Sequence, residues 1–382
     1  WEQRKFSELY EKVSRKNDLT YGKDDIISVA NMYYKAESYI TDENYLLTYN
    51  VFEMGDIAFE GNKSKNFAHG RFVENTIGNG IVSHVFDVFK PRMTNYDLQF
   101  WKYAINNERI MGPILLRSTK ASTMMTNLVA DDFLQENFLI PCYEEQKKIG
   151  EFLNQLDTLI TLHQRKYEKL VNIKKSMLDK MFPQNGVSVP EIRFKGFTDP
   201  WEQRKLKELY FQLTERNADL LPYQKTLSVA TMSFKTDGNG AADTSLANYK
   251  RLRTGDIAFE GHTSKEFRYG RFVLNDVGDG IMSPRFSALR PLHEMPINFW
   301  KYYIHYEPIM RKVLVNSTKA GTMMNELVIN EFLQESILVP SVAEQQAIGR
   351  FFKQLDTLIT LHQRKLEKLQ NIKKSCLEKM FV

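Results

Sequence analysis

Asp56, Glu60 and Lys63 lie within eight residues of one another and could form a hydrolytic site. A metal-dependent nuclease binds its metal ion with two carboxylates and has a lysine nearby. The same segment returns 200 residues later, where both carboxylates are kept but Thr263 replaces the lysine. The spacing is also Glu-x-x-Lys, whereas the nuclease pattern has Glu-x-Lys. We therefore interpret the segment as a strand with a solvated edge, and keep a self-sufficient nuclease as an alternative.

The remaining residues do not form a catalytic or metal-binding pattern. The sequence has no glycine-rich cofactor loop before a helix and no G-x-x-x-x-G-K-[ST] motif. The two cysteines, Cys142 and Cys376, occupy non-equivalent places, which argues against a disulfide or a zinc site. His69 becomes Tyr269 in the second copy, so it is not a repeated base or ligand. We therefore expect no catalytic residue, no metal site and no cofactor in this chain.

Long segments of the sequence occur twice. The recurring segments are WEQRK at 1–5 and 201–205, STKASTMM at 118–125 with STKAGTMM at 317–324, and QLDTLITLHQRK at 155–166 and 354–365. The period is 200 residues and then 199 residues. Because solenoid repeats are far shorter, the pattern indicates a duplicated domain.

Each copy begins with a globular part that we predict to be α+β. Short strand-like runs such as DIAFE, RFV and VFDVF alternate there with glycine-rich turns. Helical stretches follow at about 97–116 and 297–315. The predicted boundaries are a first globule at 1–140, a helix at 141–182, a linker at 183–200, a second globule at 201–339 and a helix at 340–382.

Each copy ends in a long segment with a heptad pattern, which predicts a helix with one apolar stripe. The predicted stripe includes Leu156, Leu159, His163 and Leu170 in the first copy, and Leu355, Leu358, His362 and Leu369 in the second. Lys166 and Lys365 interrupt it, and the histidines are interpreted as residues that set the register. A long helix with one apolar stripe needs a partner. We expect the two helices to form an antiparallel coiled coil with pseudo-two-fold symmetry; alternatively, each packs on its own globule.

Composition points to a protein without a membrane span. The chain of 382 residues has a net charge of +5 and no apolar run long enough to cross a bilayer. No signal peptide opens the given sequence. The two cysteines at non-equivalent places fit a reducing compartment, so we expect a cytoplasmic protein. The segments 144–182 and 344–381 together carry +6, so the rest of the chain sums to −1. If the globules bind DNA, their basic residues must therefore gather on one face.

Basic and small polar residues crowd one turn-rich segment of each globule, and a second set follows at Ser-Thr-Lys. The candidate DNA-binding residues are Asn62, Lys63, Ser64, Lys65, Arg71 and Lys120 in the first copy, and His262, Thr263, Ser264, Lys265, Arg268, Arg271 and Lys319 in the second. Lysine and hydroxyl groups suit phosphate oxygens, and Arg, Asn and His can also read base edges. The alternative is a pair of ordinary solvated loops.

The two copies differ mainly in particular segments. The divergent pairs are 11–50 with 211–250, 62–69 with 262–269, and 84–99 with 284–298. Identical segments are candidates for scaffold and backbone contacts, and divergent segments are candidates for discrimination. A chain with two such globules could read two different short DNA sequences.

The sequence resembles the DNA specificity subunit of a Type I restriction–modification enzyme over essentially its whole length. The motif P-x-x-x-E-Q that enters each long helix carries the resemblance, and its residues are Pro141, Glu145, Gln146, Pro340, Glu344 and Gln345. The segment PEIRFKGFTDPWEQRKL at 190–206 also resembles the opening of a recognition domain in that family. The chain starts inside the equivalent of this phrase, so we expect native residues before Trp1.

The resemblance implies a non-catalytic bacterial protein that binds double-stranded DNA. Two target-recognition domains are then expected to read the halves of a bipartite, asymmetric site, and the paired helices to set the gap between them. The family's partners are two methyltransferase subunits, which bind S-adenosylmethionine and methylate adenine, and restriction motor–nuclease subunits. The six motif residues at the helix starts are expected at the subunit interface. The alternative is a duplicated protein-binding scaffold without DNA recognition.

Overall fold

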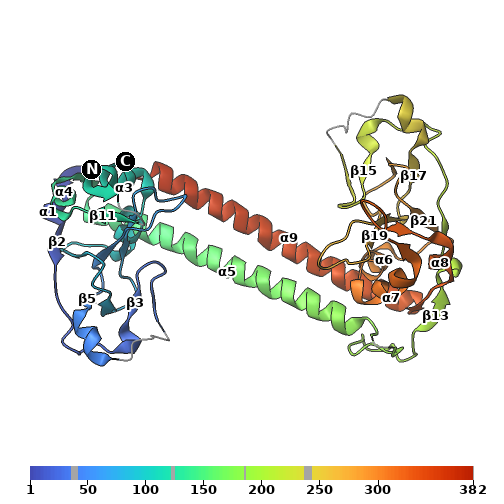
Figure 1. The fold of residues 1–382 in the computed structure, drawn as a ribbon, viewed down its shortest axis with the longest axis horizontal. Helices are drawn as coiled ribbons and strands as arrows, with labels where there is room; N and C mark the ends of the chain where they lie inside the picture. Colours follow the sequence, from blue (N-terminus) through green and yellow to red (C-terminus); the bar gives the residue numbers. More distant parts are fainter. Residues whose placement is uncertain (36–41, 122–124, 185, 236–242, 382) are drawn as a thin grey trace. The chain divides into compact units, whose positions relative to one another are not determined.

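The computed structural model describes residues 1–35, 42–121, 125–184, 186–235 and 243–381 (Figure 1). The chain forms two compact units. The first combines Trp1–Gln164 with Arg364–Val382, and the second is Arg165–Gln363. Each unit therefore contains one globule and a part of both long helices.

The first unit contains strands and helices in the same order as the second. Its strands are β1 (Glu2–Lys5), β2 (Tyr10–Val13), β3 (Ile27–Ser28), β4 (Tyr33–Tyr34), β5 (Asn50–Phe52), β6 (Ile57–Glu60), β7 (Arg71–Glu74), β8 (Gly80–Val82), β9 (Val88–Pro91), β10 (Thr119–Ala121), β11 (Thr126–Leu128) and β12 (Asn137–Ile140). Its helices before the long one are α1 (Phe6–Leu9), α2 (Leu98–Ala104), α3 (Glu108–Ser118) and α4 (Ala130–Gln135), with 3-10 helices at Lys23–Asp25 and Glu43–Thr48.

The second unit repeats this order. Its strands are β13 (Glu202–Lys205), β14 (Tyr210–Gln212), β15 (Leu227–Ser228), β16 (Ser233–Phe234), β17 (Lys250–Leu252), β18 (Ile257–Glu260), β19 (Arg271–Leu274), β20 (Gly280–Met282), β21 (Ala288–Pro291), β22 (Thr318–Lys319), β23 (Glu326–Leu327) and β24 (Ser336–Val339). Its helices are α6 (Ile297–Tyr303), α7 (Glu307–Ser317) and α8 (Ile329–Gln334), with 3-10 helices at Leu206–Glu208, Tyr223–Lys225 and Asp243–Asn248.

A four-stranded antiparallel sheet lies at the centre of each globule. Its order is β2-β9-β6-β7 in the first unit and β14-β21-β18-β19 in the second. Side chains alternate across a strand, and β6 is buried on both faces. Ile57 and Phe59 point into a large core with the helices, while Ala58 joins a smaller core on the other face. The sheet therefore separates two apolar layers.

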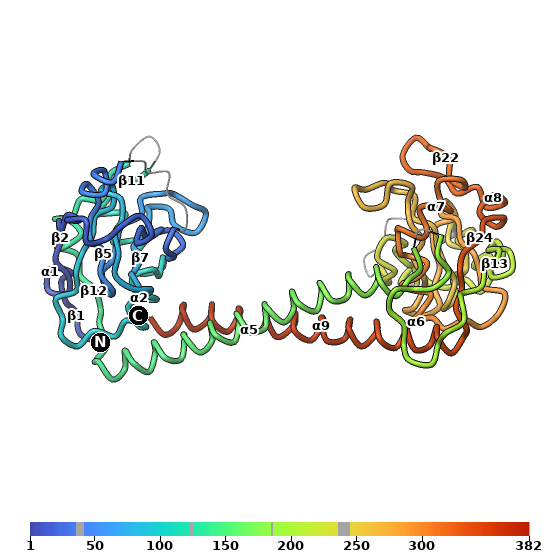
Figure 2. Tube along the Cα trace, turned by 90° about the horizontal axis from the view of Figure 1, so that it is seen from below, coloured from blue at the N-terminus to red at the C-terminus, as the bar shows by residue number. Residues whose placement is uncertain are grey.

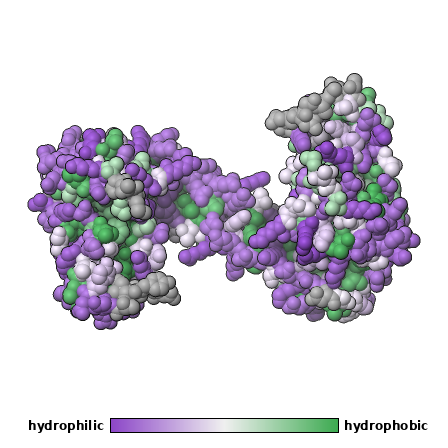
Figure 3. Space-filling view, viewed as in Figure 1, coloured by the Kyte–Doolittle hydropathy of each residue, from purple (hydrophilic) through white to green (hydrophobic). Residues whose placement is uncertain are grey.

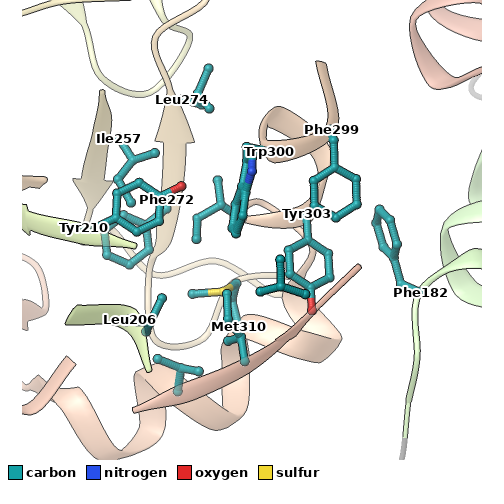
Figure 4. Packing of buried hydrophobic residues seen from close by; sticks show 14 of the residues in the cluster. Phe182, Leu206, Tyr210, Ile257, Phe272, Leu274, Phe299, Trp300, Tyr303 and Met310 are labelled. Carbon is teal, nitrogen blue, oxygen red and sulfur yellow. The ribbon is translucent and has the colours of Figure 1, made fainter. Parts of the chain in front are cut away.

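The large core is rich in aromatic side chains. In the second unit, Tyr210 and Phe272 from the sheet lie together with Trp300 and Tyr303 from α6 (Figure 4). Phe182, from the end of the first long helix, completes this cluster and lies 5.2 Å from the Tyr303 ring. These edge-to-face contacts anchor the long helix on the globule.

The α+β prediction is confirmed, with two local corrections. The helical stretch predicted at 97–116 is two helices, α2 and α3, because Asn107 caps the second by accepting a hydrogen bond from Arg109 N at 3.1 Å. The equivalent stretch is divided into α6 and α7. The strand predicted in VFDVF begins only at Val88.

Both predicted long helices are present, as α5 (Tyr143–Met181) and α9 (Val342–Lys379). They lie side by side in the two views (Figures 1 and 2), where α5 is green and α9 is red. In the second unit, Lys174 lies 2.6 Å from Asp356, and the ring of Phe182 lies 5.8 Å from that of Phe352. Later residues of α5 therefore meet earlier residues of α9, which confirms the antiparallel pairing in this unit.

The predicted stripe needs correction at two positions. Leu156 and Leu355 are buried, and Leu170 and Leu369 pack against the two large cores. Leu159 is 42% exposed and Leu358 is 43% exposed. The next residues, Ile160 and Ile359, are half-buried instead.

The buried positions 149, 153 and 156 are spaced by four and then three residues, as in a regular heptad. The predicted stripe differs because its position at Leu159 lies one residue before the half-buried Ile160. Lys166 and Lys365 are exposed and do not interrupt it. His163 and His362 are half-buried.

The face of the molecule drawn in Figure 3 is mostly hydrophilic, with small hydrophobic patches, some of them on the long helices. Within the described ranges, no helix is long and apolar enough to cross a membrane.

Candidate nucleic-acid interface

The turn-rich segment of each globule is fastened to the hairpin that follows Ser-Thr-Lys. Thr126 N in β11 donates to Gly61 O at 2.8 Å, and Asn325 N donates to Gly261 O at 2.9 Å. A Cβ on Gly61 would lie 2.1 Å from Thr126 O, and one on Gly261 would lie 2.0 Å from Asn325 O. Only glycine allows this approach. The contact therefore joins the segment that carries residues 62–65 to the β10–β11 hairpin that carries Lys120.

Ser64 and Ser264 shape the loop. The Ser64 hydroxyl accepts a hydrogen bond from Phe67 N at 3.1 Å, and Ser264 accepts from Phe267 N at 3.0 Å. This side-chain bond adds to backbone bonds between the same residues, in which Ser64 N donates to Phe67 O at 2.9 Å and Ser264 N donates to Phe267 O at 3.0 Å. Both predicted serines therefore have a structural role in the loop.

Arg71 and Arg271 tie three segments together. The Arg71 guanidinium bonds Glu60 at 2.7 Å and Ala30 O at 2.7 Å, and lies 5.1 Å from the Phe67 ring centre. Arg271 likewise donates to Ala230 O at 3.0 Å and lies over Phe267. A guanidinium with several fixed partners positions a loop more than it reads a base.

The residue after the glycine differs between the copies. Asn62 Nδ2 donates to Glu60 at 3.4 Å, whereas His262 Nδ1 lies 2.5 Å from Glu260. Glu260 is 5% exposed, but the His262 side chain is 59% exposed. The buried carboxylate thus orients an exposed imidazole in the second unit and an exposed amide in the first.

The other candidates are exposed. They are Lys63, Lys65 and Lys120 in the first unit, and Thr263, Lys265, Arg268 and Lys319 in the second. In the second unit a pocket of about 450 Å³ opens between the loop and the hairpin. Its lining includes His262, Arg285 and Asn325, together with Met323, which is 82% exposed. Hydrogen-bonding groups and an exposed apolar side chain suit contacts with base edges.

A second loop adjoins this surface, in the divergent segment 11–50, and none of its residues is among the predicted DNA-binding residues. Arg71 binds the tip of the β3–β4 hairpin, where Met32 has a φ of 47°; the equivalent Met232 has a φ of 46°. Such a conformation is costly for a residue with a side chain. The turn leaves Tyr33 50% exposed, and Ser233 occupies the equivalent place. The divergence between the two copies in this segment is the sequence signal that identifies the hairpin tip as a candidate.

The carboxylates of the nuclease alternative are engaged in ion pairs. Asp56 is buried, accepts a hydrogen bond from Glu53 N at 2.8 Å, and pairs with Arg15. Burial raises the pKa of Asp56 to about 6. Glu60 pairs with Arg71. Among the described residues, no group of three or more His, Cys, Asp and Glu side chains is arranged to hold a metal ion.

The motif residues at the helix starts make contacts within their own unit. Gln146 Nε2 donates to Pro141 O at 3.1 Å, and Gln345 Nε2 donates to Pro340 O at 2.9 Å. Both glutamines are buried, as is Glu344, but Glu145 is exposed. The glutamine contacts tie the first turn of each long helix to the proline before it. Their predicted place at a subunit interface stays a prediction.

The sequence matches the family model of the Type I restriction modification DNA specificity domain twice, over residues 1–172 and 199–371. Two relatives come from Methanocaldococcus jannaschii. The Type I restriction enzyme MjaVIII specificity subunit is 25% identical over 270 residues, covering 64% of this chain and 61% of that protein. The putative type I restriction enzyme MjaX specificity subunit is 23% identical over 252 residues, covering 62% and 56%. The matches span about three-fifths of the relatives' length.

Solved structures share the fold. The Type-I restriction-modification system S subunit from M. genitalium has a TM-score of 0.56 and 13% identity, with 100% of this chain and 96% of that chain covered. A chain from a structure of type I R-M complex assembly has a TM-score of 0.50 and 14% identity, with 99% and 97% covered. Because the family model matches most of the sequence in two copies, the chain belongs to the Type I restriction modification DNA specificity domain family.

Proposed function

We propose that this chain is the DNA-reading subunit of a Type I restriction–modification enzyme, and that its two globules read the two halves of a bipartite, asymmetric site. The chain itself is non-catalytic in this account. Methyltransferase subunits that bind S-adenosylmethionine methylate an adenine in each half-site, and motor–nuclease subunits join them for restriction. These activities are directed by the site to which this chain binds, in the cytoplasm of a bacterium.

One observation carries the proposal: the two globules share their buried scaffold and differ in the side chains that it presents. Gly61 and Gly261 make the same backbone contact, and Arg71 and Arg271 bind the same hairpin tip. The exposed positions on this scaffold change, as from Asn62 to His262. Two equal scaffolds with unequal exposed groups suit two unequal base sequences.

Phosphate contacts and base contacts fall to different residues. The exposed Lys63, Lys65 and Lys120 are suited to phosphates, and the hairpin tips and the residue after the glycine to base edges. The globules lack a large positive charge, since the sequence outside the two helical segments sums to −1. We therefore expect weak, salt-sensitive DNA binding by the isolated chain.

The paired helices fix the gap between the half-sites and carry the partner subunits. On the helices, Leu159, Leu162, Leu358 and Leu361 are each more than two-fifths exposed. Apolar side chains left in water along a helix pair are typical of a surface that another helix covers. We assign the methyltransferase contact to this face.

The experiment is sequencing of modified adenine in a methylation-free host that expresses this chain with its cognate methyltransferase subunit. A bipartite motif with one methylated adenine on each strand is the expected result. A matched pair of variants separates the roles: Lys65→Ala should weaken modification at every site, and Tyr33→Ala should change preference in one half-site only. Absence of methylation despite a soluble complex, and absence of a DNA footprint by that complex, would favour the scaffold alternative.

A further inference from the structure

The linker packs on the second unit through an adjacent arginine and phenylalanine. Arg193 donates to both carboxylate oxygens of Glu344, from Nε at 2.9 Å and from Nη2 at 2.7 Å. The pair is shielded from water, with 11% of the Arg193 side chain and 2% of the Glu344 side chain exposed. Phe194 lies against Phe351 with ring centroids 5.9 Å apart. A two-point guanidinium–carboxylate contact gives both strength and orientation.

The backbone of the same segment is held as well. Ile192 N donates to Lys180 O at 2.9 Å, at the end of α5, and Trp201 N donates to Ser188 O at 2.8 Å. The last carbonyls of a helix have no partner within the helix, so the segment supplies one. Trp201, which follows the segment, is 3% exposed. Residues 188–200 therefore act as a cover over this side of the second unit.

The first unit has the surface that such a segment covers. Glu145 corresponds to Glu344 and Phe152 to Phe351 in the repeated sequence. Glu145 is exposed, and Phe152 is 41% exposed. Trp1, equivalent to Trp201, is 37% exposed.

The surroundings of this surface match those in the second unit. Phe381 lies edge-to-face with Trp1 with ring centroids 6.3 Å apart, as Phe182 lies edge-to-face with Trp201 at 6.4 Å. Trp1 Nε1 donates to Glu145 Oε1 at 3.1 Å, so a neutral group stands where Glu344 binds a guanidinium.

We propose that Trp1, Glu145, Phe152 and the end of α9 form a docking site for an extended polypeptide segment with the pattern Ile-Arg-Phe. The arginine of the segment pairs with both oxygens of Glu145 and displaces the Trp1 hydrogen bond. Its phenylalanine covers the exposed ring of Phe152, and its isoleucine N–H binds a last carbonyl of α9. The second unit shows each of these contacts already made, and the site does not depend on DNA binding.

The test uses a fluorescent synthetic peptide of residues 188–200, SVPEIRFKGFTDP, added to the full chain and followed by fluorescence anisotropy. Saturable binding is expected. Glu145→Ala should weaken it at least about tenfold, since it removes a charged, two-point hydrogen-bonded pair. Phe152→Ala should weaken it less. Both residues are exposed, so neither variant threatens folding. A peptide with Arg193→Ala and Phe194→Ala is the control and should not bind.

A second test links the segment covalently to the chain, so that docking no longer costs the entropy of bringing two molecules together. Residues 183–200 placed directly before Trp1 should raise the midpoint of thermal unfolding, and Arg→Ala within the added segment should cancel most of the rise. Peptide binding that Glu145→Ala and Phe152→Ala leave unchanged would overturn the proposal, because the peptide would then be displacing the linker of the second unit. Failure of both peptide binding and the thermal shift would overturn it too.

Discussion

Lys174 of α5 lies 2.6 Å from Asp356 of α9, which makes it a cross-helix ion pair inside the second unit. The lysine also lies 5.1 Å from the ring centre of Tyr302, whose hydroxyl donates to the other oxygen of Asp356 at 2.6 Å. Burial raises the pKa of Tyr302, and the hydrogen bond to the Asp356 carboxylate raises it further. One helix is thus joined to the other helix and to the globule by three side chains.

The ion pair should fix the register of the helices. Lys174→Asp should lower the free energy of unfolding by about 1 kcal/mol, because two carboxylates then face each other in a half-exposed place. Adding Asp356→Lys should restore part of the loss, because the ion pair returns but the Tyr302 hydroxyl loses its acceptor. Denaturant unfolding of the single and double variants measures the coupling. Lys175→Asp, at an exposed neighbouring position, is the control and should change little. Equal losses at both lysines would contradict the assignment.

A second network of ion pairs carries opposite charges at equivalent positions of the two copies. In the first unit, Arg15 binds Glu53 and the buried Asp56. In the second, Glu215 stands in the place of Arg15 and binds Arg253 and Arg290. In this unit the buried Asp256 pairs with Arg290 instead, at 2.8 Å.

This exchange predicts a compensating pair of substitutions. Arg15→Glu should destabilise the first unit by about 3 kcal/mol, since it leaves the buried Asp56 without its guanidinium. Adding Glu53→Arg and Lys90→Arg copies the second unit and should recover most of the loss. Unfolding of the single and triple variants by urea tests this. A triple variant as unstable as the single variant would show that the two networks are not equivalent.

The first unit carries a buried acid that the second replaces with leucine. Glu74 is 3% exposed and accepts a hydrogen bond from Tyr96, which lies 3.0 Å from the Tyr10 hydroxyl. Burial raises the pKa of Glu74 well above its ordinary value; Tyr96 and Lys102 oppose the shift, and Asp97 adds to it. The equivalent Leu274 lies in an apolar core.

Glu74→Leu should therefore stabilise the first unit at neutral and higher pH. The stability from the protonated Glu74 is complete below its unfolded pKa and is lost as the pH rises towards the folded pKa. The gain from leucine should be small near pH 4 and reach about 1–3 kcal/mol near pH 8. Denaturant unfolding across this range measures it, with Val73→Leu as a control for side-chain size. A gain that did not depend on pH would refute the assignment.

The sequence predicted the duplicated architecture, the antiparallel helices and the position of the exposed loop, because repeats and heptads are visible without coordinates. It did not separate Lys65, which is exposed, from Arg71, which fastens the β3–β4 hairpin, since both are basic residues in one loop. It also placed Leu159 in the helix seam. Two apolar residues in succession, Leu159 and Ile160, leave the stripe ambiguous by one position, and the packing of the globule decides it.

The exposed leucines of the helices test the partner surface. Leu159→Asp should leave the chain folded and reduce its association with the methyltransferase subunit at least about tenfold, because a charge there must be desolvated on binding. Leu156→Asp, at a residue that is 6% exposed, should instead destabilise the chain itself. Unfolding and co-purification of both variants distinguish the two effects. If the Leu159 variant associated as well as the unchanged chain, the partner would bind another face of the helices.

The central claim is that each globule reads its own half of the DNA site. The most direct measurement replaces residues 6–140 with residues 206–339, expresses this chain with the methyltransferase subunit, and sequences the methylated adenines. The account predicts an inverted repeat of the half-site that the second globule reads, with the gap unchanged because the helices are unchanged. Methylation that kept both original half-sites, or a soluble complex whose motif had no relation to either, would contradict it.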